Sequence, residues 1–434
     1  MNEVQPGTAA LTRERLRILF LCEQYPPVVW DGVGSYTHDI AHALAELGHE
    51  VHIVCAQGFR VVDEVHSGVH VHRRPLFRLP VSRFLGPLRP WVAGRDYPRD
   101  SIMLRVALTL SYAFWLQRLN LKPDVVETQE GETRALSIAL RHDVPLVVHL
   151  HTPTMLDLRM RDGELRMIGR LADRLDQISA RHADALTCPS ELLAQTLREY
   201  HWLPPTGCEV QVIPYPFDGS SLATLPPPTD TRPIVMTVGR VEWRKGPDVL
   251  IDAAGLLVQR GLPIELLFCG AFAGSSEGLP IEVWLKKRAA RLGVTCRFTG
   301  HIGREQLLEH YASARVVAVP SRFESFSIAA FEGMAAGRPL VATSSIGAAP
   351  FIDRWQSGSV VPANDAPALA DALAPFLIDA NHATATGARG RTGTATHDSA
   401  HIATLRERVY RRAIEAHKLR RASAVRGDVV SAER

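Results

Sequence analysis

The sequence predicts an α/β protein made of two doubly wound domains that face each other. First, a chain of 434 residues is long for one hydrophobic core, so two domains of about 200 residues are expected. Second, apolar strand-like runs alternate with helical patterns in both halves, which indicates parallel sheets covered by helices. Third, residues 217–233 are rich in Pro, Ser and Thr, as is typical of an interdomain linker.

Composition narrows the class of protein. The chain is 46% hydrophobic and 22% charged, with a net charge of +3, which argues against nucleic acid as the main partner. It has no run of 18 apolar residues, and residues 1–14 lack a signal-peptide core, so we expect a cytoplasmic protein. The six cysteines form no CxxC pair, which favours reduced thiols without a metal cluster.

The first half opens with a β-loop-α-β unit. An apolar strand at 15–27 is followed by Gly32 and Gly34, by a helix that ends at Gly48, and by a strand at 51–56. This order predicts a parallel pair with a right-handed crossover. The glycine-rich loop would let a ligand approach the backbone, but a tight turn that needs small residues explains it equally well.

Residues 72–100 form a segment rich in Pro, Arg and aromatic residues, with little periodicity. Long irregular segments of compact domains are often functional loops, so we interpret this one as an acceptor-side loop. Its basic residues also permit peripheral contact with an anionic membrane, although a solvated loop packed on its own apolar residues is an equally good reading. These basic residues are Arg73, Arg74, Arg78, Arg83, Arg89, Arg95 and Arg99.

Two further buried strands, at 123–129 and 145–153, are separated by a helical segment predicted to begin near Glu132. The second strand carries His149 and His151, which alternation places on one face. Ligands bind beyond the carboxyl ends of parallel strands, so a histidine here is a candidate site residue; one packing histidine and one surface histidine remain the alternative. The remaining elements of this half are predicted at 101–119, about 164–182, 183–190 and 209–216, with Ser190 as a helix N-cap.

The second half repeats the alternation. A strand at 233–240 leads through a charged loop to a helix with Pro247 at its start and Gly261 at its end. Further strands are predicted at 264–270, 296–300 and 315–319, and helices at about 281–292 and 304–313. The expected organisation is an N-terminal domain at 1–216, the linker at 217–233, a C-terminal domain at 234–400, a helix at 401–421 that packs back toward the N-terminal domain, and a disordered tail at 422–434.

The stretch 320–347 combines a strand end, a turn and a helix start. Unsatisfied amides at such a helix start attract anions. The loop after the strand at 233–240 would bring two cations to the same sheet edge, which suggests a diphosphate clamp; each cation alone could instead be a solvated loop charge. No DxD pair occurs in the chain, which favours a clamp without metal. The cations are Arg240 and Lys245, and the amides belong to Ser325, Phe326, Ser327 and Ile328.

Two acids accompany this helix start. Glu332 lies among Ala, Phe, Gly and Met, so burial would cost free energy unless a polar group such as a ribose hydroxyl meets it. Glu324 can accept hydrogen bonds from sugar hydroxyls. Alternatively, it is a favourable charge near the positive end of the helix dipole, worth about 0.3–1 kcal/mol.

The segment 320–343 resembles the ExxxxxxxE signature of retaining GT-B glycosyltransferases of family 4, the glycosyl transferases group 1, with Glu324 and Glu332 at the right spacing. Residues 239–246 and 298–321 and the glycine-rich loop match as well, so the resemblance covers nearly the whole chain. It implies two Rossmann-like domains facing a cleft. It also implies transfer of a hexose-type sugar from a nucleoside-diphosphate sugar to a small-molecule, glycan or lipid-linked acceptor, without cofactor or metal.

The resemblance also implies residue roles. Acceptor attack and nucleotide departure would share one face of the sugar, with the leaving phosphate taking the acceptor's proton. His151 would orient a sugar hydroxyl or stabilise the reacting sugar through its carbonyl. The implied donor contacts are Arg240 and Lys245 with the amides of Phe326, Ser327 and Ile328 for the diphosphate, Glu332 for ribose, Glu324 for the sugar, the backbone near Ile302 for the base, and Gly34 for the phosphates on closure.

Two departures from the family pattern stand out. Ser325 and Ser327 occupy positions where glycine is usual, which implies a tighter sugar pocket or additional hydroxyl donors. Tyr215 and Pro216 replace a frequent Asn-Gly pair before the interdomain hinge, which implies a stiffer hinge or a rebuilt turn. The alternatives are a disaccharide phosphorylase of the same fold, a non-catalytic relative that acts as a binding subunit, and a lipid glycosylator peripheral at the inner face of the membrane.

Overall fold

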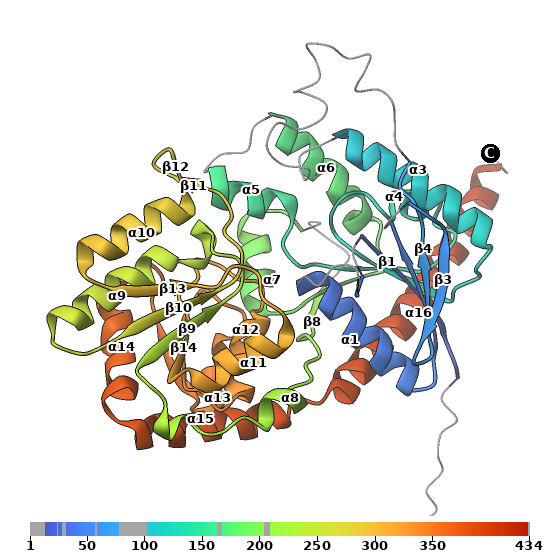
Figure 1. Cartoon of the computed structure of the whole chain (residues 1–434). Coiled ribbons are helices and arrows are strands. Elements are labelled where there is room, and N and C mark those ends of the chain that lie inside the picture. Colours follow the sequence, from blue (N-terminus) through green and yellow to red (C-terminus); the bar gives the residue numbers. More distant parts are fainter. Residues whose placement is uncertain are drawn as a thin grey trace, which may run out of the picture.

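The framework consists of two sheets, one in each half of the chain (Figure 1). The computed structural model describes residues 14–23, 25–27, 32–56, 59–77, 102–162, 167–203 and 209–432. The first sheet has the order β3-β4-β2-β1-β5-β6-β7-β8, and its pairs are parallel except for the antiparallel β3 and β4. Its strands are β1 (Arg17–Cys22), β2 (Glu50–Cys55), β3 (Val62–His66), β4 (Val69–Arg73), β5 (Val125–Gln129), β6 (Leu146–His149), β7 (Ala185–Cys188) and β8 (Val210–Val212).

The second sheet has the order β13-β10-β9-β14-β15-β16 and is parallel. Its strands are β9 (Ile234–Val238), β10 (Glu265–Cys269), β13 (Thr295–Phe298), β14 (Val316–Val319), β15 (Leu340–Thr343) and β16 (Gly358–Val361), and a small hairpin pairs β11 (Ser275–Ser276) with β12 (Leu279–Pro280). Most of these strands are continuous apolar runs, as expected when helices cover both faces. Two doubly wound Rossmann-like domains are therefore confirmed.

Helices connect and cover the strands. The first half contains α1 (Gly32–Glu46), α3 (Ile102–Leu119), α4 (Leu136–Arg141), α5 (Thr154–Asp162), α6 (Met167–Arg181) and α7 (Glu191–Glu199). The second half contains α8 (Ser220–Ala223), the 3-10 turns η4 (Pro228–Asp230) and η5 (Trp243–Lys245), α9 (Pro247–Gln259), α10 (Ile281–Leu292), α11 (Arg304–Ser313), α12 (Ile328–Ala335), α13 (Ala349–Trp355), α14 (Ala366–Ile378), α15 (Ala380–Ala395) and α16 (Ser399–Ala432). Ser190 caps α7 through a hydrogen bond from the Leu193 amide to its hydroxyl, as predicted.

The β3–β4 hairpin was not predicted, and it changes the interpretation of 72–100. Arg73 ends β4 and Arg74 follows it, and both side chains are buried. Arg73 lies 3.2 Å from Glu64 and Arg74 lies 2.6 Å from Asp63, because β3 places its acids beside the end of β4. The assignment of these two arginines to a membrane-facing loop is therefore wrong. The part of the predicted loop at 78–100 lies outside the described residues.

Three local predictions also differ from the structure. The helix expected near Glu132 begins at Leu136, because Glu132 and Thr133 have φ values of 64° and 56°, which a right-handed helix excludes. Gly34 lies inside the first turn of α1 rather than in a loop before it. The final helix reaches Ala432 instead of ending at 421, since no proline interrupts it.

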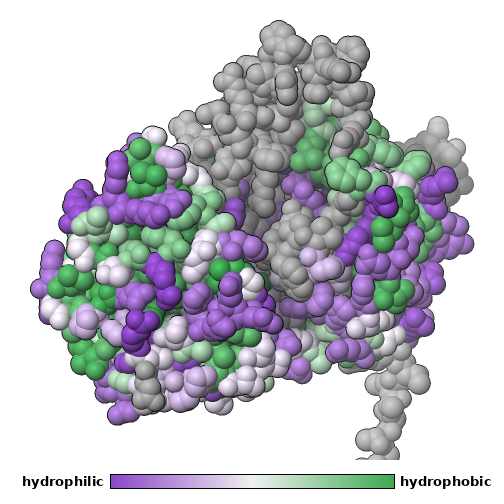
Figure 2. Space-filling model, in the orientation of Figure 1, coloured by the Kyte–Doolittle hydropathy of each residue, from purple (hydrophilic) through white to green (hydrophobic). Residues whose placement is uncertain are grey.

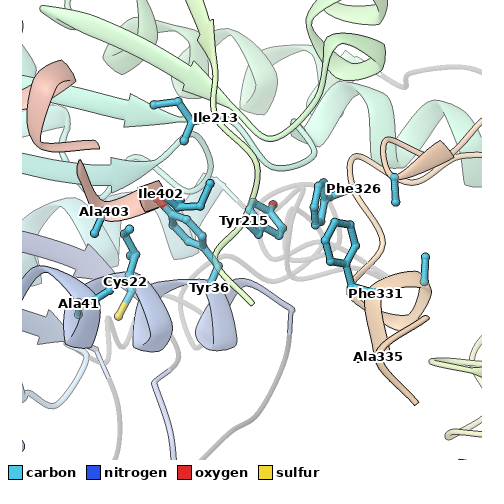
Figure 3. Packing of buried hydrophobic residues seen from close by; sticks show 14 of the residues in the cluster. Cys22, Tyr36, Ala41, Ile213, Tyr215, Phe326, Phe331, Ala335, Ile402 and Ala403 are labelled. Carbon is cyan, nitrogen blue, oxygen red and sulfur yellow. The ribbon is translucent and has the colours of Figure 1, made fainter. Parts of the chain in front are cut away.

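One hydrophobic cluster joins the two domains. It runs from β1 and α1 through Tyr215 to Phe326 and Phe331 (Figure 3). The helix α16 follows the C-terminal domain and packs on α1 and on β5 to β7 of the first sheet, so its red ribbon lies along the half that holds the first sheet in Figure 1. The visible described surface mixes polar and apolar side chains (Figure 2). No helix in the described part of the chain is both long and apolar enough to span a bilayer.

Candidate active site

The candidate site lies at the carboxyl ends of β9 and β14, which are neighbours in the second sheet. The loop after β9 contains η5, and the loop after β14 leads into α12. The two loops touch at Gly246, where an added Cβ would lie 2.1 Å from the carbonyl oxygen of Pro320. Gly246 also has a φ of +65°, so a glycine is needed for both the backbone and the close approach.

Lys245 and Glu324 form an ion pair in this site, with Nζ 2.8 Å from Oε2. Ser321 donates a hydrogen bond of 2.6 Å to the other carboxylate oxygen of Glu324. Burial lowers the pKa of Lys245, and the Glu324 carboxylate opposes this effect. Burial alone would raise the pKa of Glu324, but the charges of Lys245 and Arg244 hold it below its ordinary value. Each member of the pair therefore supports the charge of the other.

Arg240 and Arg244 share the buried carboxylate of Glu242, at 3.3 Å and 2.8 Å. Arg244 also donates to the carbonyl oxygen of Phe323 at 2.9 Å, which links the two loops. The side chain of Arg240 is 52% exposed. This long, exposed guanidinium is on the same loop as Lys245 and can turn toward an anion that enters the site.

The residues before α12 are held from both domains. The hydroxyl of Ser190, from the first domain, donates to the carbonyl of Ser325 at 2.6 Å, and the amide of Ala348 donates to the carbonyl of Phe326 at 2.8 Å. Ser327 is 5% exposed and has a φ of +95°, and Ile328 is the first residue of α12. Among the described residues, the Ser327 hydroxyl has no hydrogen-bond partner.

Glu332 meets polar partners that the sequence did not reveal. Arg304 lies 2.6 Å from one carboxylate oxygen, and the Tyr311 hydroxyl donates to the other at 3.1 Å. Arg304 is 46% exposed, so another donor can exchange with it. Because Arg304 begins α11 and Ile302 lies just before it, the structure brings Ile302 and Glu332 to the same edge of the second domain.

His151 follows β6 in a turn held by Glu130, whose carboxylate accepts the amides of His151 and Thr152 at 2.9 and 2.6 Å. Its Nδ1 bonds to the Tyr215 hydroxyl. The Tyr215 ring lies 5.0 Å from the Phe326 ring (Figure 3). Tyr215 therefore links His151 to the loop before α12. His149 and His151 lie edge to face at 4.5 Å and are both buried; a surface position for either is therefore wrong.

The sequence also did not predict a polar cluster that lies behind these histidines. Arg406 of α16 is fully buried and lies 2.8 Å from His149 Nδ1 and 3.4 Å from Glu127. Tyr36, which stacks on His149 at 4.5 Å, donates to Glu127 at 2.6 Å. Burial and the nearby charge of Arg406 place the pKa of His149 well below its ordinary value. Tyr215, which departs from the family pattern, could have indicated this cluster from the sequence. No sequence pattern around Arg406 indicated its role.

Together, the site can bind an anion and a polyhydroxyl compound. Arg240, Lys245 and the start of α12 offer positive charge, while Glu324 and Glu332 offer hydrogen-bond acceptors. Gly34 lies on α1 of the first domain. In the part of the chain that the structure describes, no group of three His, Cys, Asp or Glu residues is arranged to hold a metal ion.

Comparison with known proteins places the chain among enzymes of sugar transfer. Residues 226–393 match the family model of Glycosyl transferases group 1, and residues 31–216 match that of a Glycosyl transferase 4-like domain. A D-inositol 3-phosphate glycosyltransferase of Xylanimonas cellulosilytica is 30% identical over 377 residues, covering 80% of this chain and 84% of that protein. A glycogen synthase of Mycobacterium tuberculosis is 27% identical over 408 residues, covering 91% of this chain and 94% of that protein.

A similar fold occurs in the solved structure of sucrose-phosphate synthase from Thermosynechococcus elongatus. The TM-score is 0.72 at 22% identity, covering 93% of this chain and 100% of that one. At this identity the likeness concerns the fold alone.

Proposed function

The chain belongs to the group 1 glycosyl transferases of family 4 and is a glycosyltransferase with the GT-B fold, and we propose that it moves a hexose-type sugar from a nucleoside-diphosphate sugar to an acceptor hydroxyl with retention of configuration. The observation that carries this proposal is the ion pair between Lys245 and Glu324 just before α12, with the exposed Arg240 on the same loop as Lys245. It combines a cationic grip for a diphosphate with an acceptor for sugar hydroxyls.

Arg240, Lys245 and the amides of Phe326, Ser327 and Ile328 would bind the diphosphate. As the bond between the anomeric carbon and the phosphate oxygen breaks, the negative charge grows on the leaving diphosphate, where these groups stabilise it. The acceptor oxygen bonds to the anomeric carbon on the same face, and its proton passes to the leaving phosphate oxygen. In this proposal the clamp works without a metal ion.

The two acids would have separate tasks. Glu324 would hold Lys245 in place with one oxygen and accept a donor-sugar hydroxyl at the other, in exchange for Ser321. Glu332 would bind the ribose hydroxyls in place of the exposed Arg304. The backbone near Ile302, on the same edge, would meet the base. Gly34 would approach the phosphates if the domains close further.

His151 would lie on the sugar side of the donor. Its imidazole bonds to Tyr215 through Nδ1, which fixes the orientation of the ring. Its carbonyl accepts the Thr152 hydroxyl at 2.7 Å and has a second lone pair for a sugar that develops positive charge. The relatives named for D-inositol 3-phosphate and for glycogen support a small-molecule or glycan acceptor; a lipid-linked acceptor rests on the sequence alone.

The proposal is tested in two steps. A thermal-shift panel of UDP-, GDP-, ADP- and dTDP-glucose identifies the donor, because a bound ligand raises the melting temperature by mass action. Turnover is then compared in Arg240→Ala and Lys245→Ala. We expect each change to lower kcat by about 10²–10³-fold, the range for loss of one charge-stabilising group, while Lys286→Ala, on the exposed face of α10, stays near wild type.

Arg240→Ala is the more informative variant, because Arg240 is half exposed and its loss leaves the Lys245–Glu324 pair intact. Full turnover in both variants would refute the diphosphate clamp. Release of sugar from a product by inorganic phosphate, without a nucleotide, would instead identify a phosphorylase.

A further inference from the structure

A basic hollow lies in the N-terminal domain, and none of the proposed active-site residues lines it. It has a volume of about 470 Å³ and is bordered by α5, by α6 and by the end of α7. The helices α5 and α6 pack against each other, as seen in Figure 1. We call it the arginine hollow after its four basic lining residues, which are Arg159, Arg170, Arg174 and Arg181.

The four guanidinium groups come from two helices. Arg170, Arg174 and Arg181 are spaced by four and seven residues on α6, so they share one side of that helix. Arg159 comes from α5, and its guanidinium lies 4.8 Å from the centre of the Tyr200 ring. A cation–π contact at this distance holds Arg159 at the rim. The arrangement concentrates positive charge around one open hollow.

Within the described residues, one acid lines the hollow against four arginines. Asp173 is the one acidic residue that lines the hollow, and its oxygens accept hydrogen bonds from the Met155 amide at 3.1 Å, from Trp202 Nε1 at 2.9 Å and from Gln177 at 2.8 Å. None of the four arginines forms an ion pair with a described carboxylate. Four like charges around one volume repel one another, and a bound anion would relieve that repulsion.

We propose that the arginine hollow is a binding site for a phosphate-bearing ligand, separate from the nucleotide-sugar site. The guanidinium fork matches phosphate oxygens in pairs, which a single ammonium group cannot do. The volume falls in the range of small-molecule pockets, about 300–1,000 Å³. It therefore accommodates a phosphate together with the ring or headgroup attached to it. This inference does not depend on the proposed donor chemistry.

The phosphate belongs to either a soluble metabolite or a lipid headgroup. Met167 and Leu171 are 62% and 50% exposed, and both lie within one turn of Arg170 or Arg174 on the same side of α6. Apolar residues beside a basic row are typical of a surface that meets anionic lipid. Both sources present the same chemistry to the arginines, so the experiment includes one probe for each.

The test compares two double variants in the full chain. Arg170→Gln with Arg174→Gln removes two charges from the hollow, while Arg408→Gln with Arg412→Gln removes two exposed charges at the same spacing from α16. The probes are inorganic phosphate, followed by calorimetry, and sedimentation with phosphatidylcholine vesicles that contain phosphatidylglycerol. Circular dichroism melting checks that both variants fold, and donor-induced thermal shifts check the nucleotide-sugar site independently.

We expect the hollow variant to bind at least one probe about tenfold more weakly than wild type, with the control variant within about twofold of wild type. If the hollow variant loses binding of inorganic phosphate alone, the ligand is a soluble metabolite. Loss of vesicle binding, reversed by added salt in the wild type, identifies a headgroup. Equal binding by the two double variants, or no binding of either probe by the wild type, overturns the proposal whatever the donor experiments show.

Discussion

The backbone conformation and the buried side chain of Ser327 both raise the free energy of the folded protein. Its φ of +95° lies in the left-handed region, which L-residues other than glycine adopt at a cost of about 1–2 kcal/mol. Its hydroxyl is buried without a hydrogen-bond partner among the described residues. Such strain persists where the surrounding structure or a ligand requires the residue, and Ser327 lies where the donor phosphate is proposed to bind.

Ser327→Gly should therefore stabilise the protein by about 1 kcal/mol, because the relief of φ strain and of the orphaned hydroxyl exceeds the extra chain entropy of glycine, about 0.5–1 kcal/mol. Urea denaturation measures the difference. Ser325→Gly is the matched control and should be destabilising, since Ser325 has no positive φ. If Ser327→Gly lowers stability instead, the hydroxyl has a structural partner and the strain argument fails.

Glu23 provides a titratable group at the end of β1. Burial and the neighbouring Glu132 carboxylate raise the pKa of Glu23 to about 7, although Arg134 at 3.1 Å opposes them. As the pH rises, the unfolded chain releases the Glu23 proton near a glutamate pKa of about 4.3, whereas the folded protein keeps it to a higher pH. This contribution to stability is fully present below about pH 4.3 and is lost as the pH rises through about 7.

Glu23→Gln should remove this dependence. From pH 5 to pH 8, the unfolding free energy of the wild type should fall by about 1 kcal/mol relative to that of the variant. This value is reduced for the partial exposure of Glu23. Urea titrations at the two pH values measure it, and taking the difference cancels the other titrating groups. A constant difference would show that Glu23 titrates normally.

At the scale of elements, the junction of η5 and α9 positions the cationic loop. Gly246 ends η5 and precedes α9, and Lys245 is the residue before it. A side chain at 246 would meet the carbonyl of Pro320 and would push apart the two loops that carry Lys245 and Glu324. Gly261, at the other end of α9, has a φ of +77° but nothing within 4 Å of its Cβ position.

Gly246→Ala should cost more than 2 kcal/mol and lower kcat/KM, since the clash adds to a backbone penalty of about 1–2 kcal/mol. Gly261→Ala should show the backbone penalty alone, with kcat/KM unchanged. Denaturation and steady-state kinetics on both variants separate the two effects. Similar losses in both variants would mean that the contact with Pro320 relaxes freely.

At the scale of the whole molecule, α16 joins the end of the chain to the first sheet. Arg406 lies 2.7 Å from the Thr187 hydroxyl and 2.8 Å from His149, and Tyr410 donates to Glu127 at 2.7 Å. These side chains are buried. The C-terminal helix therefore completes the polar core behind His151, and the two domains share it.

Arg406→Met should destabilise the protein by about 3 kcal/mol, because the Glu127 carboxylate is left buried without its cation. Adding Glu127→Gln should recover about half of that loss, whereas Arg408→Met, on the exposed side of α16, should cost less than about 0.5 kcal/mol. Chemical denaturation of the wild type, Arg406→Met, Glu127→Gln and the double variant measures the cycle, and Arg408→Met is its control. No recovery in the double variant would show that Arg406 acts through His149 or Thr187 instead.

The sequence by itself determined the class of fold and indicated the residues of the candidate site. Alternating apolar strands and helices predicted two parallel sheets, and α10 and α11 have the predicted bounds, because periodicity and caps are local properties. The glutamate pair, with a glycine-flanked cationic loop at the same sheet edge, indicated where the donor would bind. Each of these signals is contained in one short stretch of the sequence.

Only the tertiary structure decided how the site is supported. The pairs Arg304–Glu332, Tyr215–His151 and Arg406–Glu127 join residues 28, 64 and 279 positions apart. No local pattern encodes such contacts, because they depend on how helices pack on the finished sheets and on where the chain returns. The β3–β4 hairpin was missed for a related reason. Its short strands are largely polar, and they are stabilised by pairing, β4 with β2 and β3 with β4, more than by their own sequence.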